Sequence, residues 1–149
     1  MRPAGGQDTA IADASLFVAL LVGEDHPLID EALPVLDRVQ AGELRLILTP
    51  VVVAEIAHVC RARLGMSRQA IAEVLAQLMD ARGVDVMEPV AVRAAIELFR
   101  KQPRLSFPDA YLAGLSISAG LALVASLDRD FDTIDGLQRI PQEGKERPA

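Results

Sequence analysis

Residues 44–60, LRLILTPVVVAEIAHVC, hold the clearest sign of the fold class. The first six of them, 44–49, are mostly apolar and have the length expected for a buried strand. Thr49 and Pro50 then supply a helix N-cap and a first-turn residue, and they predict a helix that reaches about Leu64. A buried strand that leads straight into a helix is typical of a parallel sheet covered by helices.

The same alternation of strands and helices continues on both sides of this stretch. Further strands are predicted at residues 9–13, 84–87, 121–126 and 137–140, the last at the edge of the sheet. Further helices are predicted at residues 15–22, 28–41, 67–81, 89–101 and 107–119, with a helical turn at 128–134. Short connections and right-handed crossovers then predict an α/β fold with three α/β/α layers. Helices would cover both faces of a central parallel sheet of about four to five strands.

The length of the chain, 149 residues, is that of one ordinary domain. We expect a single domain over residues 9–140, after a flexible N-terminus at 1–8 and before a polar, disordered tail at 141–149. No apolar run reaches the roughly 18–20 residues of a membrane span, and the N-terminus lacks an apolar signal core. Cys60 is the only cysteine, which leaves no intrachain disulfide and leads us to expect a cytoplasmic protein.

The overall charge restricts how the chain can meet a polyanion. A formal net charge of -6 argues against nucleic-acid binding through a broad basic face. The absence of Trp and the presence of a single Tyr argue against an aromatic platform for single strands. However, a carboxylate cluster that holds cations is itself acidic, and the bound ions reverse the local charge. The acidity therefore leaves a metal-dependent enzyme open.

Acidic residues follow two of the predicted strands. Asp13 ends the first strand and Asp128 follows the fourth, and ligands of parallel sheets bind where the strands end. The alternative for Asp13 is a helix N-cap or a turn residue, and the alternative for Asp128 is a solvated acidic turn shared with Asp130 and Asp132. Asp128 is nearest to the strand end and is the first candidate, with Asp130 as the second.

Two further acids lie early in predicted helices. Glu55 is the only ionised side chain in a long apolar stretch, so we expect it to be buried, which is costly unless it is paired or bound to metal. A buried ion pair or the exposed edge of the helix are the alternatives. Asp109 lies in the first turn of its helix, where the helix dipole alone favours an acid, but its apolar neighbours predict partial burial.

Together these positions suggest one metal site. Asp13, Glu55, Asp109 and Asp128 offer oxygen ligands, and no cluster of His or Cys accompanies them. Such a donor set suits Mg²⁺ or Mn²⁺ rather than Zn²⁺. These cations promote phosphodiester hydrolysis, so we expect a metal-dependent hydrolase. Ser15 and Ser126 lie close to the acids and are candidates for orienting carboxylates or waters.

Four stretches of the chain resemble those of PIN-domain proteins, and more narrowly the toxins of VapBC toxin–antitoxin pairs. In chain order they are IADASLFVALL (11–21), LTPVVVAEIAHV (48–59), LSFPDAYLAGLS (105–116) and LVASLDRDFDTIDGL (123–137). The resemblance implies a central parallel sheet between helices and a Mg²⁺- or Mn²⁺-dependent ribonuclease site made of carboxylates.

Carried over onto this chain, the resemblance assigns the family's acids to catalysis and metal binding. The first falls on Asp13, in a D-x-S context with Ser15, and the helix acid falls on Glu55. The acid of the S-F-P-D-A stretch falls on Asp109. The last falls on Asp128, which follows Ser126 in an S-x-D pattern, and Asp130 is a possible additional ligand.

The resemblance also implies partners. VapC-type toxins act on RNA, typically dimerise, and are held inactive by a small VapB-type antitoxin, so we expect a homodimer with a cognate antitoxin. Two alternatives stay open: a PIN nuclease of RNA processing outside toxin–antitoxin systems, and a non-catalytic PIN-like module for protein interaction. The RNA that is cleaved, the substrate-binding residues and the number of metal ions cannot be read from the sequence.

Overall fold

The computed structural model describes residues 5–142 of the chain. Residues 1–4 of the predicted flexible N-terminus and residues 143–149 of the predicted disordered tail lie outside the described residues. Contacts between Cα atoms divide the chain into two compact units, with the boundary between Glu88 and Pro89. We call the part before this boundary unit 1 and the part after it unit 2.

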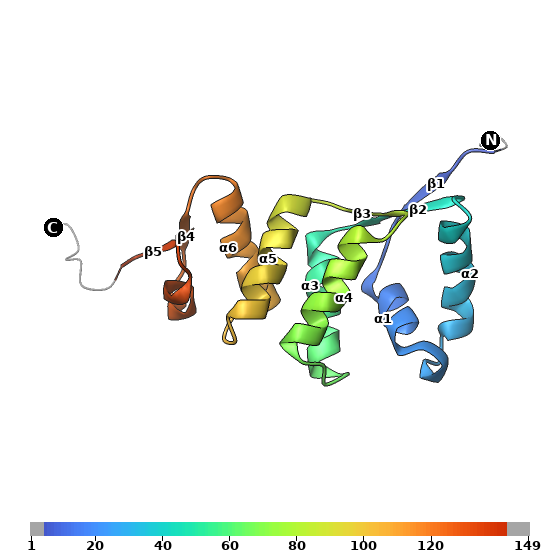
Figure 1. Ribbon diagram of the computed structural model, residues 1–149, viewed down its shortest axis with the longest axis horizontal. Coiled ribbons are helices and arrows are strands. Elements are labelled where there is room, and N and C mark those ends of the chain that lie inside the picture. The colour runs from blue at the N-terminus through green and yellow to red at the C-terminus, as the bar shows by residue number, and fades with distance from the viewer. Residues whose placement is uncertain (1–4, 143–149) are drawn as a thin grey trace. The chain divides into compact units, whose positions relative to one another are not determined.

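Unit 1 is built on a sheet of three parallel strands (Figure 1). The strands are β1 (Asp8–Ile11), β2 (Leu44–Leu48) and β3 (Val84–Val86), and β2 lies between the other two. In the register of the sheet Ala10 pairs with Leu46, and Leu46 pairs with Val84. All three strands therefore end at the same edge.

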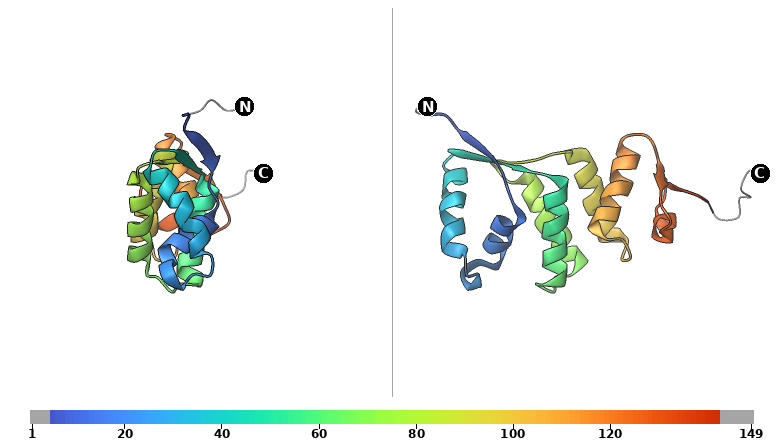
Figure 2. Two further views of the ribbon diagram at one scale, coloured as in Figure 1. Left: turned by 90° about the vertical axis from the view of Figure 1, so that its right-hand side faces the viewer. Right: turned by 180° about the vertical axis from the view of Figure 1, so that it is seen from behind.

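Four α-helices lie on one side of this sheet, as the view from behind also shows (Figure 2, right). They are α1 (Ala14–Val22), α2 (Ile29–Gln40), α3 (Pro50–Ala62) and α4 (Arg68–Asp80), and the short 3₁₀ helix η1 (Gly23–Asp25) follows α1. Every second residue of β2 is buried, namely Leu44, Leu46 and Leu48. The alternation gives the sheet one apolar face for the helices to cover.

Unit 2 pairs two helices with a small sheet. Its elements are α5 (Pro89–Lys101), α6 (Phe107–Ser118), β4 (Leu123–Ala125), the 3₁₀ helix η2 (Arg129–Thr133) and β5 (Gln138–Ile140). Strands β4 and β5 are parallel. The helices approach closely at Gly114 of α6, where a Cβ atom would come within 2.9 Å of the backbone nitrogen of Ala95. The rings of Phe99 and Phe107 meet edge to face, with 5.8 Å between their centroids.

The predicted strands and helices are all present, and their ends differ from the prediction by no more than about two residues. The α/β class with parallel strands is confirmed. The sheet of unit 1 has three strands and that of unit 2 has two, whereas one sheet of four to five strands was predicted. Apolar periodicity shows that a segment can form a strand, but it does not specify the neighbour with which the strand pairs. No helix within residues 5–142 is long and apolar enough to cross a membrane.

Candidate metal centre

Asp13 lies at the junction between β1 and α1. Its two chain neighbours, Ala12 and Ala14, are buried, while Asp13 itself is exposed. Asp13 occupies the N-cap position, yet its side chain makes no hydrogen bond that caps α1. Instead, its Oδ2 accepts a hydrogen bond of 2.8 Å from the hydroxyl of Ser15. The backbone N–H groups of the first turn of α1 lie near this carboxylate without forming a capping hydrogen bond, so the helix-cap alternative for Asp13 is realised only in part.

The same surroundings keep Asp13 ionised. The hydrogen bond from the Ser15 hydroxyl lowers the pKa of the Asp13 carboxyl below its ordinary value, and the backbone N–H groups of Ala14 and Ser15 act in the same direction. Hydrogen bonds to a carboxylate favour its charged form. A carboxylate must be deprotonated to bind a metal ion, so the lowered pKa of Asp13 extends the pH range of its binding-competent form toward acid.

Glu55 lies in the second turn of α3, and the prediction that it is buried is wrong. The buried face of α3 is formed by Val53, Ile56, Ala57 and Cys60, whereas Glu55 is exposed. Val51, one turn earlier on the same side of the helix, is 77% exposed. An apolar neighbour in the sequence thus does not imply an apolar neighbour in space. Glu55 is accessible to a cation, but its burial no longer supports a functional role.

Asp109 is the third residue of α6 and is half-buried, as the sequence predicts. The helix begins with a capping hydrogen bond of 3.3 Å from the Asp109 backbone N–H to the hydroxyl of Ser106. Phe107 and Ala110 on either side are buried in unit 2. Because Ser106 provides the cap, the side chain of Asp109 is not needed for it.

Asp128 lies in the loop between β4 and η2 and is exposed. Its Oδ1 accepts a hydrogen bond of 2.8 Å from the backbone N–H of Asp130, and so it caps η2. Its own backbone N–H donates to the hydroxyl of Ser126 at 3.0 Å. One carboxylate oxygen of Asp128 thus accepts a hydrogen bond within the turn, as expected for an acid with a structural role there. The other, Oδ2, accepts no hydrogen bond from the described residues and can face a cation.

The three neighbouring acids differ in their partners. Asp132 forms a bidentate ion pair with Arg139, at 3.0 and 3.2 Å, and this pair occupies its carboxylate. Asp130 is half-buried and remains the second candidate after Asp128. Sequence reasoning missed Arg139, which is buried. An arginine in the apolar edge strand LQRI, a few residues after a run of acids, was the available signal.

The four candidate carboxylates are divided equally between the two units. Asp13 and Glu55 belong to unit 1, and Asp109 and Asp128 belong to unit 2. Within the described residues, no three metal-binding side chains are gathered into one cluster. The donor set still fits a hard cation, because all four groups are carboxylates and each is exposed or half-buried.

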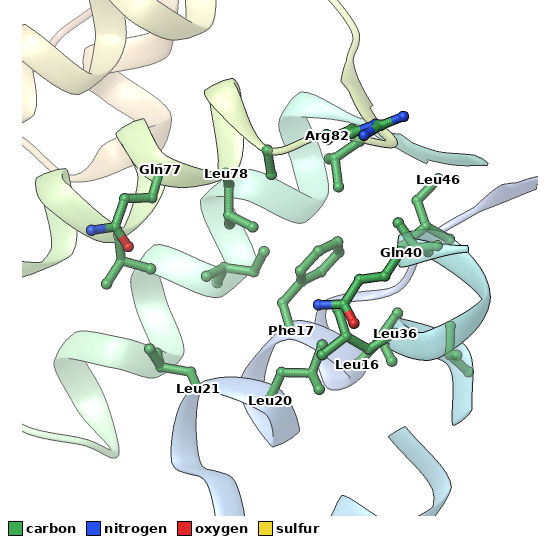
Figure 3. Close-up of a pocket in the computed structure, with 16 residues that line it drawn as sticks. Leu16, Phe17, Leu20, Leu21, Leu36, Gln40, Leu46, Gln77, Leu78 and Arg82 are labelled. Atoms are coloured by element: carbon green, nitrogen blue, oxygen red, sulfur yellow. The ribbon is translucent and has the colours of Figure 1, made fainter. Parts of the chain in front are cut away.

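An apolar cavity of about 460 Å³ lies within unit 1, and it is distinct from these acids (Figure 3). Leu16 and Leu20 of α1, Leu36 of α2 and Leu78 of α4 contribute to its walls, and none of the four carboxylates lines it. Gln40, Gln77 and Arg82 are the polar exceptions in a mostly aliphatic wall, which therefore offers few of the cationic and polar groups that a phosphate backbone binds. The cavity is therefore not the candidate site for a nucleic acid.

Comparison with known proteins gives one family match. The family model described as "PIN domain" matches residues 10–137. This range includes parts of both units and contains Asp13, Glu55, Asp109 and Asp128. No curated protein and no solved structure matches the chain significantly.

Proposed function

This chain belongs to the PIN-domain family, and from that membership we propose that it is a metal-dependent endoribonuclease acting as the toxin of a type II toxin–antitoxin pair. PIN domains are generally nucleases that depend on divalent metal ions, which makes a hydrolase of phosphodiester bonds the class that fits this chain. Beyond this class, we propose that the metal is Mg²⁺ or Mn²⁺, that the substrate is RNA and that the protein is a toxin.

The placement of the four acids on their elements carries the proposal. Asp13 follows β1 in the sheet of unit 1, and Asp128 follows β4 in the sheet of unit 2; each strand has a parallel neighbour in its own sheet. Glu55 and Asp109 lie in the first two turns of α3 and α6. Ligands of parallel α/β proteins bind beyond the carboxyl ends of the strands. One family segment, residues 10–137, holds all four acids, and on the ground of that membership we propose each of them as a metal ligand.

The acids and the two serines have different roles in the proposed site. Asp13, Asp109, Asp128 and Glu55 would hold the ion or ions, with Asp130 as a further ligand. Ser15 donates a hydrogen bond that orients Asp13 and favours its charged form, and Ser126 accepts one from the backbone N–H of Asp128. A bound Mg²⁺ or Mn²⁺ supplies a Lewis acid that activates water and stabilises the leaving oxygen of a phosphodiester.

Titration with Mn²⁺ by calorimetry tests the proposed site. We expect Asp13→Asn and Asp109→Asn each to weaken Mn²⁺ binding by about tenfold or more, because each removes a charged ligand. Asp37→Asn and Asp135→Asn are matched controls, since both residues are exposed acids outside the proposed site. Equal affinities in the site variants and the controls would instead indicate a module for protein interaction.

Expression in cells tests the proposed biology. We expect the intact chain to arrest growth in the cytoplasm, and co-expression of a cognate VapB-type antitoxin to relieve the arrest. An uncompensated carboxylate cluster attracts a cationic side chain of such a partner as readily as it attracts a metal. Asp13→Asn should be harmless. Metal-dependent RNA cleavage without growth arrest would point to a nuclease of RNA processing.

The expected homodimer is checked by light scattering of the purified chain.

A further inference from the structure

Arg139 is a buried cation in the middle of the short edge strand β5. Its side chain is 5% exposed, and its carboxylate partner Asp132 is 48% exposed. A buried charge is costly unless it is paired and its donors are satisfied. The hydrogen-bond partners of the Arg139 guanidinium therefore indicate why an arginine is tolerated at this buried position.

The guanidinium of Arg139 donates hydrogen bonds in two directions. Nε and Nη2 reach the two oxygens of Asp132 at 3.0 and 3.2 Å. Nη1 reaches the backbone carbonyl of Ser126 at 3.1 Å. Ser126 precedes Asp128 by two residues, and Asp132 follows it by four. One rigid planar group thus joins the two ends of the loop that carries Asp128.

Hydrogen bonds inside the loop pass this constraint on to Asp128. The Ser126 hydroxyl accepts from the Asp128 backbone N–H at 3.0 Å, and Asp128 Oδ1 accepts from the Asp130 backbone N–H at 2.8 Å. The Ser126 backbone N–H also donates to the carbonyl of Ile140, beside Arg139 in β5, at 3.1 Å. The backbone and one carboxylate oxygen of Asp128 are thereby fixed, and Oδ2 is directed by the same frame.

We propose that Arg139 is a positioning residue, which holds the two ends of this loop, at Ser126 and Asp132, so that the Asp128 carboxylate is set for metal binding. Arg139 acts through the loop and does not itself touch the metal or the substrate. The inference rests on the proposed function, because it takes Asp128 to be a metal ligand.

The shape of the guanidinium explains why an arginine stands here. Its planar fork can meet both oxygens of a carboxylate while a third N–H points elsewhere, and the ammonium of a lysine cannot reproduce this pattern. Arg139→Lys should therefore keep the charge but hold the loop loosely. Arg139→Gln should lose both the charge and the bidentate pair.

Mn²⁺ titration of the full chain, together with unfolding by urea, tests the inference. We expect Arg139→Gln to weaken Mn²⁺ binding by about tenfold, a typical effect of removing a group that orients a ligand, and Arg139→Lys to have a smaller effect. In the Asp128→Asn background, Arg139→Gln should cause no further loss. A purely structural role would change the unfolding midpoint without this dependence on Asp128.

Arg45→Gln is the matched control, since it breaks the bidentate pair with Asp85 in unit 1 and should leave the Mn²⁺ affinity unchanged.

The outcomes separate the two proposals. Wild-type Mn²⁺ affinity in folded Arg139→Gln, or equal losses with and without the Asp128 carboxylate, would overturn the role of Arg139 alone. If Arg139→Gln does not fold, Arg139→Lys and Asp132→Asn carry the same comparison. If wild type and Asp128→Asn bind Mn²⁺ equally, the proposed metal site fails, and the role of Arg139 fails with it.

Discussion

Asp13 and Asp128 both follow a strand, but their side chains are held in different ways. The Asp13 carboxylate accepts a hydrogen bond from the side-chain hydroxyl of Ser15, two residues later. The Asp128 carboxylate accepts one from the backbone N–H of Asp130, and its loop is fixed from β5 by Arg139. The first arrangement depends on one neighbouring side chain, and the second depends on a network. Substitutions near the two acids should therefore have different effects.

Replacing Ser15 by Ala should change the titration of Asp13. The variant loses the hydroxyl that contributes most to the lowered pKa of Asp13, so this pKa should rise toward the ordinary value of about 4. The carboxylate would then become protonated at higher pH than in wild type. NMR titration of the Asp13 carboxyl carbon in metal-free protein measures the change. Ser67→Ala, which removes a cap of α4, is the control and should leave the Asp13 pKa unchanged.

The sequence predicted the positions of these acids better than their surroundings. Asp13 and Asp109 follow from local signals, namely the end of an apolar strand and the first turn of a helix. The burial of Glu55 was wrongly predicted because exposed Val51 shares its side of α3. Arg139 was missed because its partners, Ser126 and Asp132, come together only through the folding of the loop.

Among the elements, helix starts were the easiest to predict. Thr49, Ser67 and Ser106 each accept a capping hydrogen bond from a backbone N–H three residues later, at 3.3, 3.1 and 3.3 Å. A cap depends on a few adjacent residues, so the sequence shows it directly. Strand ends depend on a pairing partner elsewhere in the chain. Accordingly β4, predicted at 121–126, covers only Leu123–Ala125.

Replacing Gly114 by Ala should destabilise the contact between α5 and α6. The added Cβ would lie 2.9 Å from the Ala95 backbone nitrogen and 3.0 Å from the Ala91 carbonyl oxygen, and neither can move without moving α5. Overpacking of this kind costs about 1–3 kcal/mol. Urea unfolding measures the loss. An increase in stability, which the higher helix propensity of Ala would give in open space, would contradict this close approach.

Breaking the ion pair between Arg45 of β2 and Asp85 of β3 should reduce stability in a pH-dependent way. The hydrogen bond from Arg45 holds the pKa of Asp85 below its ordinary value, so the pair stabilises the fold above the unfolded-state pKa of Asp85. This stabilisation is lost as the pH falls through the lowered folded-state pKa. Arg45→Gln should therefore be less stable than wild type at neutral pH and nearly equal to it in acid. Urea midpoints across this range test the sign, and a difference that grows in acid would contradict it.

At the scale of the whole molecule, the family match assigns both units to one PIN-domain segment, which local sequence patterns could not do. It covers residues 10–137 in a single family segment, across the boundary after Glu88. Sequence periodicity predicted the α/β class and the order of the elements, but it could not show which strands share a sheet. The formal charge of -6 is also a property of the whole chain, and bound cations would reduce the repulsion it causes.

Metal binding at the proposed site should stabilise the folded chain. A ligand that binds only the folded state raises the free energy of unfolding by about 2.7 kcal/mol at 100 times its Kd. We therefore expect Mn²⁺ to raise the thermal midpoint of wild type and to have much less effect on Asp13→Asn or Asp109→Asn. Sodium chloride at the same ionic strength controls for screening by salt. An equal shift in all three proteins would show that Mn²⁺ acts outside the proposed site.

Cleavage of RNA in the presence and absence of divalent metal tests the central claim most directly. The account predicts that purified wild type cleaves RNA with Mg²⁺ or Mn²⁺ and that EDTA stops the reaction. It also predicts that Asp13→Asn and Asp109→Asn lose activity by at least about 100-fold while their circular dichroism is unchanged. Cleavage that survives EDTA, or that survives both substitutions, would contradict it.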